Sequence, residues 1–343
     1  MNVSDGSRIG FSISFIVSFL LTPLVRRFGH GFRLLDIPNE RSSHAVPTPR
    51  TGGIAILLGV VAGVAAAGSL ASNPARALLL GAVTLGAVSL YDDRRTLPRH
   101  SRLLAQIIVA VVVLYTTRLT VQTIELPFMG TIDLGALAIP IAVFWIIGVT
   151  NAYNFMDGIN GIASFEAVIC SVTLGILLVS GGDLPGTVLA VAIAGAAAGF
   201  LPWNLGGSIF MGDVGSAGLG FLLSFLVLRT SRVAPSVAAI LPLAPFLFDA
   251  GVTIVTRAVK GERFFSTPHR SHFYQRLVAS GQSHVTVSLI YATLALLSSL
   301  LALAYGQLTD AQRTLAILLL ILLHTSVAAA TFLLESRRRI ASV

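Results

Sequence analysis

Long apolar stretches, separated by short polar segments, run along the whole chain. Each stretch is close to the roughly 17–25 residues that a helix needs to cross a bilayer, and charged residues, prolines and glycines mark the breaks. The pattern predicts about eleven transmembrane helices, near 9–27, 52–71, 75–91, 103–118, 136–150, 161–180, 185–201, 214–229, 236–257, 285–305 and 312–334. We therefore expect an all-α polytopic membrane protein that forms one integral-membrane domain.

Composition supports this interpretation and excludes a soluble protein. The chain is 55% hydrophobic and 11% charged, with a mean hydropathy of +0.85, whereas soluble domains carry about 25% charged residues. Its single cysteine, Cys170, excludes a disulfide framework. The net charge of +8 is explained by membrane topology, so we expect no nucleic-acid partner.

The basic residues also predict the orientation. With the N-terminus outside, 17 of the 23 Lys and Arg residues fall in cytoplasmic segments and 6 in outer ones. This bias follows the positive-inside rule and places the C-terminus in the cytoplasm. The outer segment 119–135 alternates apolar and polar residues, which predicts a small β-hairpin.

Four carboxylates lie where apolar helices meet the cytoplasmic face: Asp92, Asp93, Asp157 and Asp213. Acids from different loops at one membrane level can converge on a metal ion or a proton. Adjacent acids also raise each other's proton affinity, so Asp92 or Asp93 could serve as a base. The alternative is ion pairing with the neighbouring arginines, and these residues alone do not decide between the two.

A second cluster follows the predicted helix 136–150. Asn151, Asn154, Asp157 and Asn160 recur every three residues, a spacing that aligns them on one side of a helical turn. Polar side chains at this depth are costly unless they bind something. Amides can hydrogen-bond a nucleobase or a sugar, and Asp157 can bind Mg²⁺ or a ribose. Helix capping is the alternative.

A third cluster, Gly212 to Ser216, opens the helix expected to begin near Val214. A helix N-terminus favours phosphate, and Asp213 could hold a divalent cation that bridges phosphates. A plain N-cap role for Asp213 is the alternative. The segment is not a Walker loop, because no Gly-Lys-Ser/Thr sequence follows.

The fourth cluster is the basic segment 257–276. His269 and His272 stand three residues apart, but zinc would need further ligands that the segment lacks. With Arg257 and Arg270 they fit anion recognition better, and a solvated basic loop is the alternative. We expect the site to form from loops 28–51, 92–102, 151–160, 202–213 and 258–284.

In this order, the clusters resemble the polyprenyl-phosphate N-acetylhexosamine-1-phosphate transferase family, glycosyltransferase family 4. The resemblance spans about residues 20–280. It is carried by these motifs: Asp92-Asp93 with Arg102 and Gln106, NAYNFMDGINGI at 151–162, FMGDVGS at 210–216, PHRSHFYQRL at 268–277 and the early pattern D-x-P-N-x-R-x-x-H at 36–44 followed by P-x-P-R-x-G-G at 47–53.

The resemblance implies a reaction and a set of partners. A UDP-N-acetylhexosamine would give its sugar-1-phosphate to polyprenyl (undecaprenyl) phosphate and release UMP, starting a lipid-linked polysaccharide such as an O-antigen. Mg²⁺, with Mn²⁺ as an alternative, would be the cofactor. The site would face the cytoplasm from the bacterial cytoplasmic (inner) membrane, and a homodimer is left open.

The resemblance also assigns roles to residues. Asp92 and Asp93 would be catalytic, and Asp213 and Asp157 would hold the metal. Substrate would be bound by Asn154, Asp157, Asn160, Arg257, His269, Arg270 and His272.

Three positions depart from the family pattern. Asn160 stands where a second Asp is common, and Ser208 where a Lys is usual. The H-x-x-H spacing of His269 and His272 is closest to the branch that acts on UDP-linked 6-deoxy-HexNAc sugars.

Two other function classes compete with the enzyme. A secondary transporter of an anionic solute could use Asp249, which lies deep in an apolar stretch, together with the cytoplasmic acids. Transporters place ionisable residues near the bilayer midplane, and here only Asp249 is that deep. A lipid-binding scaffold would not need the Gly-Asp-x-Gly-Ser segment.

Overall fold

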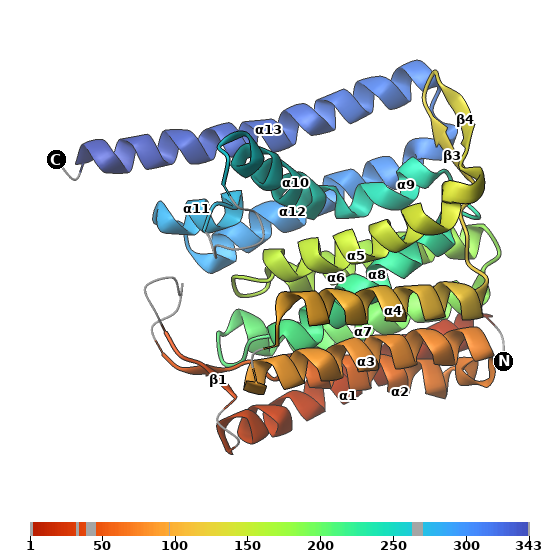
Figure 1. Cartoon of the computed structure of the whole chain (residues 1–343), viewed down its shortest axis with the longest axis horizontal. Helices are drawn as coiled ribbons and strands as arrows, with labels where there is room; N and C mark the ends of the chain where they lie inside the picture. The colour runs from red at the N-terminus through yellow and green to blue at the C-terminus, as the bar shows by residue number, and fades with distance from the viewer. Residues whose placement is uncertain (1–2, 32–33, 39–45, 96, 263–269, 342–343) are drawn as a thin grey trace.

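A computed structural model of the chain describes residues 3–31, 34–38, 46–95, 97–262 and 270–341. Helices dominate it (Figure 1). The first seven α-helices are α1 (Val3–Gly31), α2 (Gly52–Ala66), α3 (Asn73–Arg95), α4 (Arg99–Thr117), α5 (Ala138–Met156), α6 (Ile162–Ser180) and α7 (Leu184–Leu205). The next six are α8 (Gly212–Thr230), α9 (Ser236–Ile240), α10 (Ala244–Val259), α11 (Phe273–Ala279), α12 (His284–Ala304) and α13 (Asp310–Ala341).

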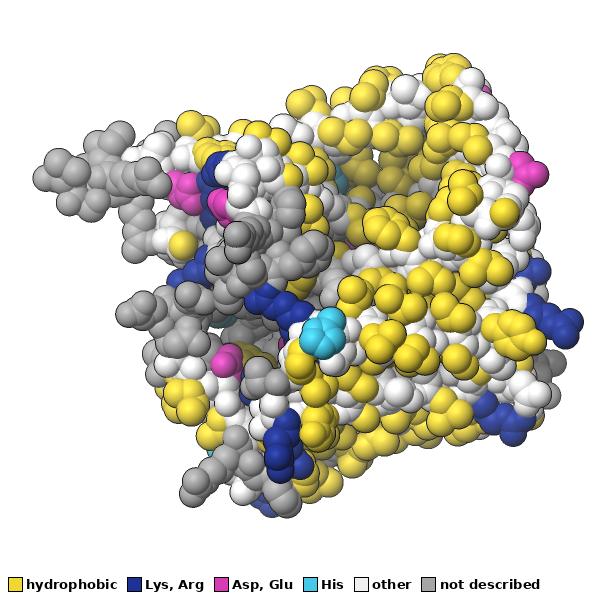
Figure 2. Space-filling view, viewed as in Figure 1, with side chains coloured by type: hydrophobic (Ala, Val, Ile, Leu, Met, Phe, Trp, Pro, Cys, Tyr) yellow, Lys and Arg dark blue, Asp and Glu magenta, His cyan; other side chains and the backbone are white. Residues whose placement is uncertain are grey.

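The predicted multi-pass membrane protein is confirmed. Within the described residues, ten helical segments are long and apolar enough to cross a membrane. The remaining predicted span, 52–71, is the shorter helix α2 of 15 residues, followed by the 3-10 turn η1 (Ser69–Ala71). Apolar side chains cover the middle of the molecule, and charged side chains lie toward its two ends (Figure 2), as expected for a chain with a membrane-embedded belt.

Helix α8 forms the centre of the bundle. In its apolar segment 83% of the residues are buried, compared with 22% in α1, α4 and α13. Helices α3 and α5 pack against α8, and α7 packs against α1 and α6. Helix α13 lies at the periphery, where it contacts α11 and α12. The start of α8, which carries Asp213, therefore belongs to the most buried of the candidate spans in the described residues.

The two ends of the bundle differ. One end carries the N-terminus and the hairpin of β3 (Thr123–Leu126) and β4 (Gly130–Asp133), which confirms the hairpin predicted within 119–135. The other end, called the site end below, carries α11, the C-terminus and the short pair β1 (Leu35–Asp36) and β2 (Thr48–Pro49). The β1–β2 pair was not predicted, because strands of two residues leave no periodic pattern.

The structure differs in detail from three of the predicted helices. The span predicted at 236–257 is confirmed as Ser236–Val259, but within it the helix is divided into α9, the 3-10 turn η3 (Leu241–Leu243) and α10. Pro242 and Pro245 lack the amide hydrogens that a continuous helix needs there. Helix α5 continues to Met156, so half of the expected loop 151–160 is helical. Helix α3 likewise continues to Arg95, so the paired aspartates lie on a helix.

Candidate functional site

Asp92 lies in the last turn of α3 and is fully engaged by the protein. Its Oδ2 atom accepts a hydrogen bond from Arg102 Nη1 at 2.8 Å, and its Oδ1 accepts one from the amide of Leu97 at 2.5 Å. Both carboxylate oxygens thus bind the segment that connects α3 to α4 and the start of α4. These contacts agree with ion pairing to a neighbouring arginine, the alternative to a role as a base.

Asp93 is held differently. Its Oδ1 atom lies 3.2 Å from Arg50 Nη1, and Arg50 Nη2 also donates to the Asp93 carbonyl oxygen at 3.2 Å. Its Oδ2 atom is buried and has no hydrogen-bond partner in the described part of the chain. Asp93 therefore keeps one carboxylate oxygen available for a ligand. Arg50, which lies 43 residues earlier, belongs to loop 28–51, which was expected to form part of the site, but it was not itself predicted as a site residue.

Asp213 lies in the first turn of α8 and joins two of the predicted clusters. Its Oδ1 atom accepts a hydrogen bond from Asn154 Nδ2 at 3.1 Å, and its Oδ2 lies 3.9 Å from Arg102 Nη1. The Asn154 amide also donates to Ser216 Oγ at 2.7 Å. Arg102 thus stands between Asp92 and Asp213, so the structure brings the paired aspartates, the amide cluster and the start of α8 together.

Asp157 follows the last residue of α5 and is partly buried. Burial raises the pKa of its carboxyl group well above the usual range, and the nearby charge of Asp213 raises it further. The amide of Asp157 donates to the carbonyl of Asn154 at 3.3 Å, and the side chain of Asn154 binds Asp213, so this turn connects Asp157 to the start of α8. In the ranges that the structure describes, no three His, Cys, Asp or Glu side chains gather as metal ligands, so any metal ion would be held by one or two carboxylates and by other ligands.

A residue that sequence reasoning missed connects two of the site loops. Asn204, near the end of α7, is 3% exposed. Its Oδ1 accepts a hydrogen bond from the amide of Gly161 at 2.6 Å, and its Nδ2 donates to the carbonyl of Ile209 at 3.1 Å. Beside it, the Oδ1 atom of Asn160 is buried and finds no partner among the described residues. Asn204 could have been noticed in the sequence, because it is a single polar side chain shortly after the apolar stretch 185–201.

The first loop is attached to the start of α8 through its backbone. The amides of Gly52 and Gly53 donate to the carbonyls of Phe210 and Met211 at 3.0 and 2.8 Å. A Cβ atom on Gly53 would lie 2.0 Å from the amide nitrogen of Gly215, so this close approach requires glycine. The attachment fixes Arg50, two residues before Gly52, near Asp93.

The fourth cluster is only partly described. His269 lies outside the described residues. Arg257 is 4% exposed and its Nε atom donates to Glu262 Oε2 at 2.7 Å. His272 is 3% exposed and its Nδ1 atom lies 3.1 Å from Asp249 Oδ1, whereas Arg270 is exposed. The predicted roles of these residues in substrate binding stay predictions.

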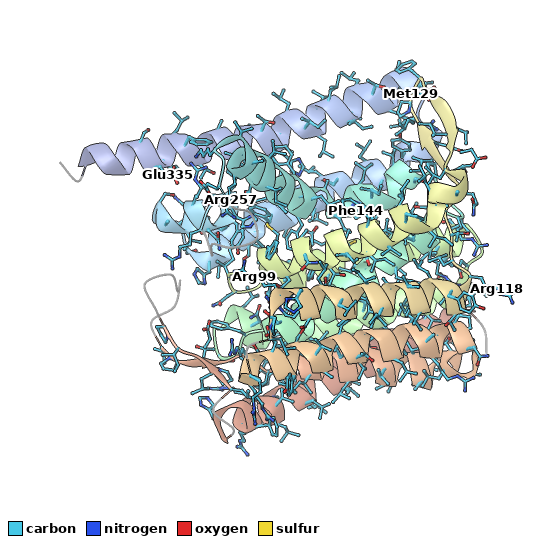
Figure 3. The ribbon with its side chains drawn as sticks, viewed as in Figure 1. Arg99, Arg118, Met129, Phe144, Arg257 and Glu335 are labelled. Atoms are coloured by element: carbon cyan, nitrogen blue, oxygen red, sulfur yellow. The ribbon has the colours of Figure 1, made fainter. Side chains whose placement is uncertain are left out.

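The labelled side chains show how charge is distributed along the bundle. Figure 3 shows Arg99, Arg257 and Glu335 toward the site end, with Arg118 and Met129 at the opposite end. The site end thus combines acids that can hold a divalent cation with arginines that can bind phosphate.

Comparison with known proteins gives consistent matches. Residues 75–231 match the model of "Glycosyl transferase family 4". The chain is 33% identical over 290 residues to the "Probable undecaprenyl-phosphate N-acetylglucosaminyl 1-phosphate transferase" of Bacillus subtilis, covering 82% of this chain and 80% of the relative. It is also 33% identical over 313 residues to the "Decaprenyl-phosphate N-acetylglucosaminephosphotransferase" of Mycobacterium tuberculosis, covering 80% and 76%. A more distant relative is the "Phospho-N-acetylmuramoyl-pentapeptide-transferase" of Clostridium perfringens, 28% identical over 294 residues, with 80% and 90% covered.

Proposed function

Because this chain belongs to glycosyl transferase family 4, we propose that it transfers an N-acetylhexosamine-1-phosphate from a UDP-sugar to polyprenyl phosphate and releases UMP. The observation that supports this best is the convergence of Asp92, Asp93 and Asp213 with Arg50 and Arg102 at one end of a membrane bundle. Two polyanions must meet in this reaction. A site built from oriented charges at the membrane border suits it.

The reaction balances without a covalent enzyme intermediate. An oxygen of the polyprenyl phosphate attacks the β-phosphorus of the UDP-sugar and forms a new P–O bond. The bond between this phosphorus and the bridging oxygen breaks, and the electron pair leaves with UMP. A phosphate monoester has lost most of its second proton at neutral pH, since that pKa is about 6, so the nucleophile needs little help from a base.

We propose Mg²⁺, with Mn²⁺ as an alternative, as the cofactor. The free Oδ2 of Asp93 and the partly exposed carboxylates of Asp157 and Asp213 are hard oxygen donors. Mg²⁺ is usually bound by one or two carboxylates together with substrate phosphates, so these residues fit it. When bound, the ion would neutralise charge on the diphosphate. We assign Asp213 and Asp157 as its ligands.

The remaining site residues orient the substrates. Asn154 holds Asp213 through its amide, and we assign Asn160 to the nucleotide side of the same turn. On the lipid side, Arg102 pairs with Asp92 and lies 3.9 Å from Asp213, so a phosphate between them would meet a guanidinium group. Asp93 is assigned to this lipid-phosphate side as well.

We assign Arg270, together with His269, His272 and Arg257, to the diphosphate and the sugar. Arg270 is exposed and can reach an anion directly. Arg257 and His272 are buried, and each contacts an acid of the protein, Glu262 and Asp249 respectively. To bind substrate, each would therefore have to exchange or share this contact.

The lipid chain needs an apolar surface that leads to the site. Val255 and Val259 in the last turns of α10 are 62% and 84% exposed, and Phe144 on α5 is 79% exposed. In a bilayer these side chains face the acyl chains. A polyprenyl chain lying against them would remain in the membrane while its phosphate reaches the charged end.

We propose that the site end faces the cytoplasm from the bacterial cytoplasmic (inner) membrane. Arg94, Arg95, Arg99 and Lys260 are exposed toward this end, as the positive-inside rule expects of a cytoplasmic face. Several finer points remain proposals: a donor from the 6-deoxy-HexNAc branch, a product used for an O-antigen or similar polysaccharide, and a homodimer. Two of the relatives above carry N-acetylglucosamine in their names.

The test is direct. The full chain, purified in nanodiscs, is given undecaprenyl phosphate and a panel of UDP-HexNAc donors with and without the 6-hydroxyl group, and UMP release is measured with Mg²⁺ and with excess EDTA. We expect Mg²⁺-dependent UMP release that needs both substrates. Absence of UMP from every donor, with folded protein and a related transferase as positive control, would refute the proposal.

A further inference from the structure

Asp249 lies in the middle of α10 and is 1% exposed. Its two carboxylate oxygens accept from five protein donors: His272 Nδ1 (3.1 Å), the amides of Phe273 (3.0 Å) and Tyr274 (3.2 Å), Thr253 Oγ1 (3.2 Å) and Tyr291 Oη (2.5 Å). A carboxylate offers about four lone-pair sites, so Asp249 is saturated by the protein itself. Such saturation suits a structural anchor and leaves no room for a transported ion.

The contacts of Asp249 fix the start of α11. The first amides of a helix have no partner within the helix and are normally capped by a nearby side chain. Here Asp249, from another helix, accepts from the amides of Phe273 and Tyr274 and from the ring of His272. Asp249 therefore caps the start of α11 from another helix.

Helix α11 in turn rests against the turn that carries Asp157. Tyr274 is completely buried, and its hydroxyl donates to the carbonyl of Phe155 at 2.9 Å. A Cβ atom on Gly158 would lie 2.1 Å from that hydroxyl oxygen, so the two segments touch. The His272 ring lies 6.4 Å from the Phe155 ring and 5.9 Å from the Tyr274 ring, between centroids.

We propose that Asp249 and Tyr274 are positioning residues for the sugar-phosphate transfer: Asp249 fixes α11, and Tyr274 holds the 155–158 turn so that Asp157 keeps its place beside Asp213. The inference rests on the proposed function. Neither residue needs to contact a substrate in this proposal. Tyr274 acts through the turn that carries Asp157, and Asp249 acts through α11 and through His272 at its start. Loss of either residue should therefore affect the side of the site assigned to the nucleotide sugar.

Two substitutions test separately the contact of Asp249 with α11 and the contact of Tyr274 with Phe155. Asp249→Asn replaces one acceptor oxygen by an NH₂ group that would face other donors, so it should release the start of α11. Tyr274→Phe removes only the hydroxyl that contacts Phe155. Tyr305→Phe is the matched control, because Tyr305 is a buried tyrosine, 2% exposed, in the turn that follows α12, away from α11.

The kinetic experiment measures UMP release by the full chain in nanodiscs while undecaprenyl phosphate and the UDP-HexNAc donor that gives the fastest release in the panel above are varied in turn. Misplacement of a binding group by an ångström is costly, so we expect both variants to raise the KM for the nucleotide sugar about tenfold. The KM for undecaprenyl phosphate should stay near that of the parent chain. Tyr305→Phe should change neither KM.

A second readout does not depend on turnover. Hydrogen exchange followed by mass spectrometry should show faster exchange at 272–279 and 153–161 in Asp249→Asn, but only at 153–161 in Tyr274→Phe. A lower kcat with unchanged KM values would indicate only a loss of folded enzyme and would overturn the inference, as would unchanged exchange in both segments. If the parent chain released no UMP, the proposed function would fail, whereas the exchange pattern would still decide whether Asp249 holds the 155–158 turn.

Discussion

Replacing Arg102 with glutamine removes a positive charge that lies 2.8 Å from an Asp92 oxygen and 3.9 Å from an Asp213 oxygen. Unit charges 3.9 Å apart attract by about 1 kcal/mol in water and about 4 kcal/mol at an effective dielectric constant near 20. The side chains of Arg102 and Asp213 are 39% and 43% exposed, so solvent screening makes the lower value appropriate. If Asp213 holds the proposed divalent cation, Arg102 competes with that cation for Asp213. Its loss should therefore tighten cation binding by about 1 kcal/mol, or roughly fivefold.

The assay is a titration of purified protein with Mn²⁺ followed by electron paramagnetic resonance, which needs no turnover. Arg95→Gln is the matched control: it removes an equal charge from the same end of the bundle, where Arg95 is exposed and forms no ion pair with an acid of the described residues. Arg102→Gln should bind Mn²⁺ about fivefold more tightly, with a raised KM for both polyanionic substrates, and Arg95→Gln should bind it like the parent chain. Weaker or unchanged Mn²⁺ binding in Arg102→Gln, or equal tightening in both variants, would refute the reasoning.

Three further changes test other parts of the structure. Asp213→Asn should lower kcat for UMP release by at least about 100-fold, the scale expected when a major charge-stabilising group is lost; near-normal turnover would remove Asp213 from the site. Asn204→Ala leaves a buried amide and a buried carbonyl unpaired, so the free energy of unfolding in mild detergent should fall by about 2 kcal/mol, and an unchanged unfolding midpoint would contradict the role given to this residue. Arg276→Lys loses the bidentate pair with Glu335, at 2.8 and 2.6 Å, so α13 should be cleaved faster in limited proteolysis, with a loss of about 1 kcal/mol; an unchanged cleavage rate would show that this pair does not hold α13.

The candidate site was largely predictable because polar side chains are conspicuous in an apolar chain. Asp92, Asp213 and Asn154 stand at the ends of apolar stretches, where a polar group is costly without a partner, and the structure brings them together. The helices were predictable for the same reason, since bilayer thickness sets their length.

The contacts between distant segments were not predictable. Arg50 reaches Asp93 across 43 residues, and nothing in the local sequence marks that pairing. Asn204 is a single amide whose two partners lie in different loops. Asp249 was taken as a candidate ion site because it lies deep, but its donors come from α10, α12 and the α11 segment, and only the packing of these elements reveals its role.

The balance of charge at the site end links cation binding to substrate binding. Among the described residues, Arg102 lies 2.8 Å from Asp92 but 3.9 Å from Asp213, and Arg50 takes one oxygen of Asp93. Burial, and then the nearby charge of Asp213, raise the pKa of Asp157. A diphosphate approaching these carboxylates would be repelled unless a divalent cation lay between them. We therefore expect the nucleotide sugar to bind together with its cation, and we expect removal of the cation to weaken binding of the donor more than binding of the lipid phosphate.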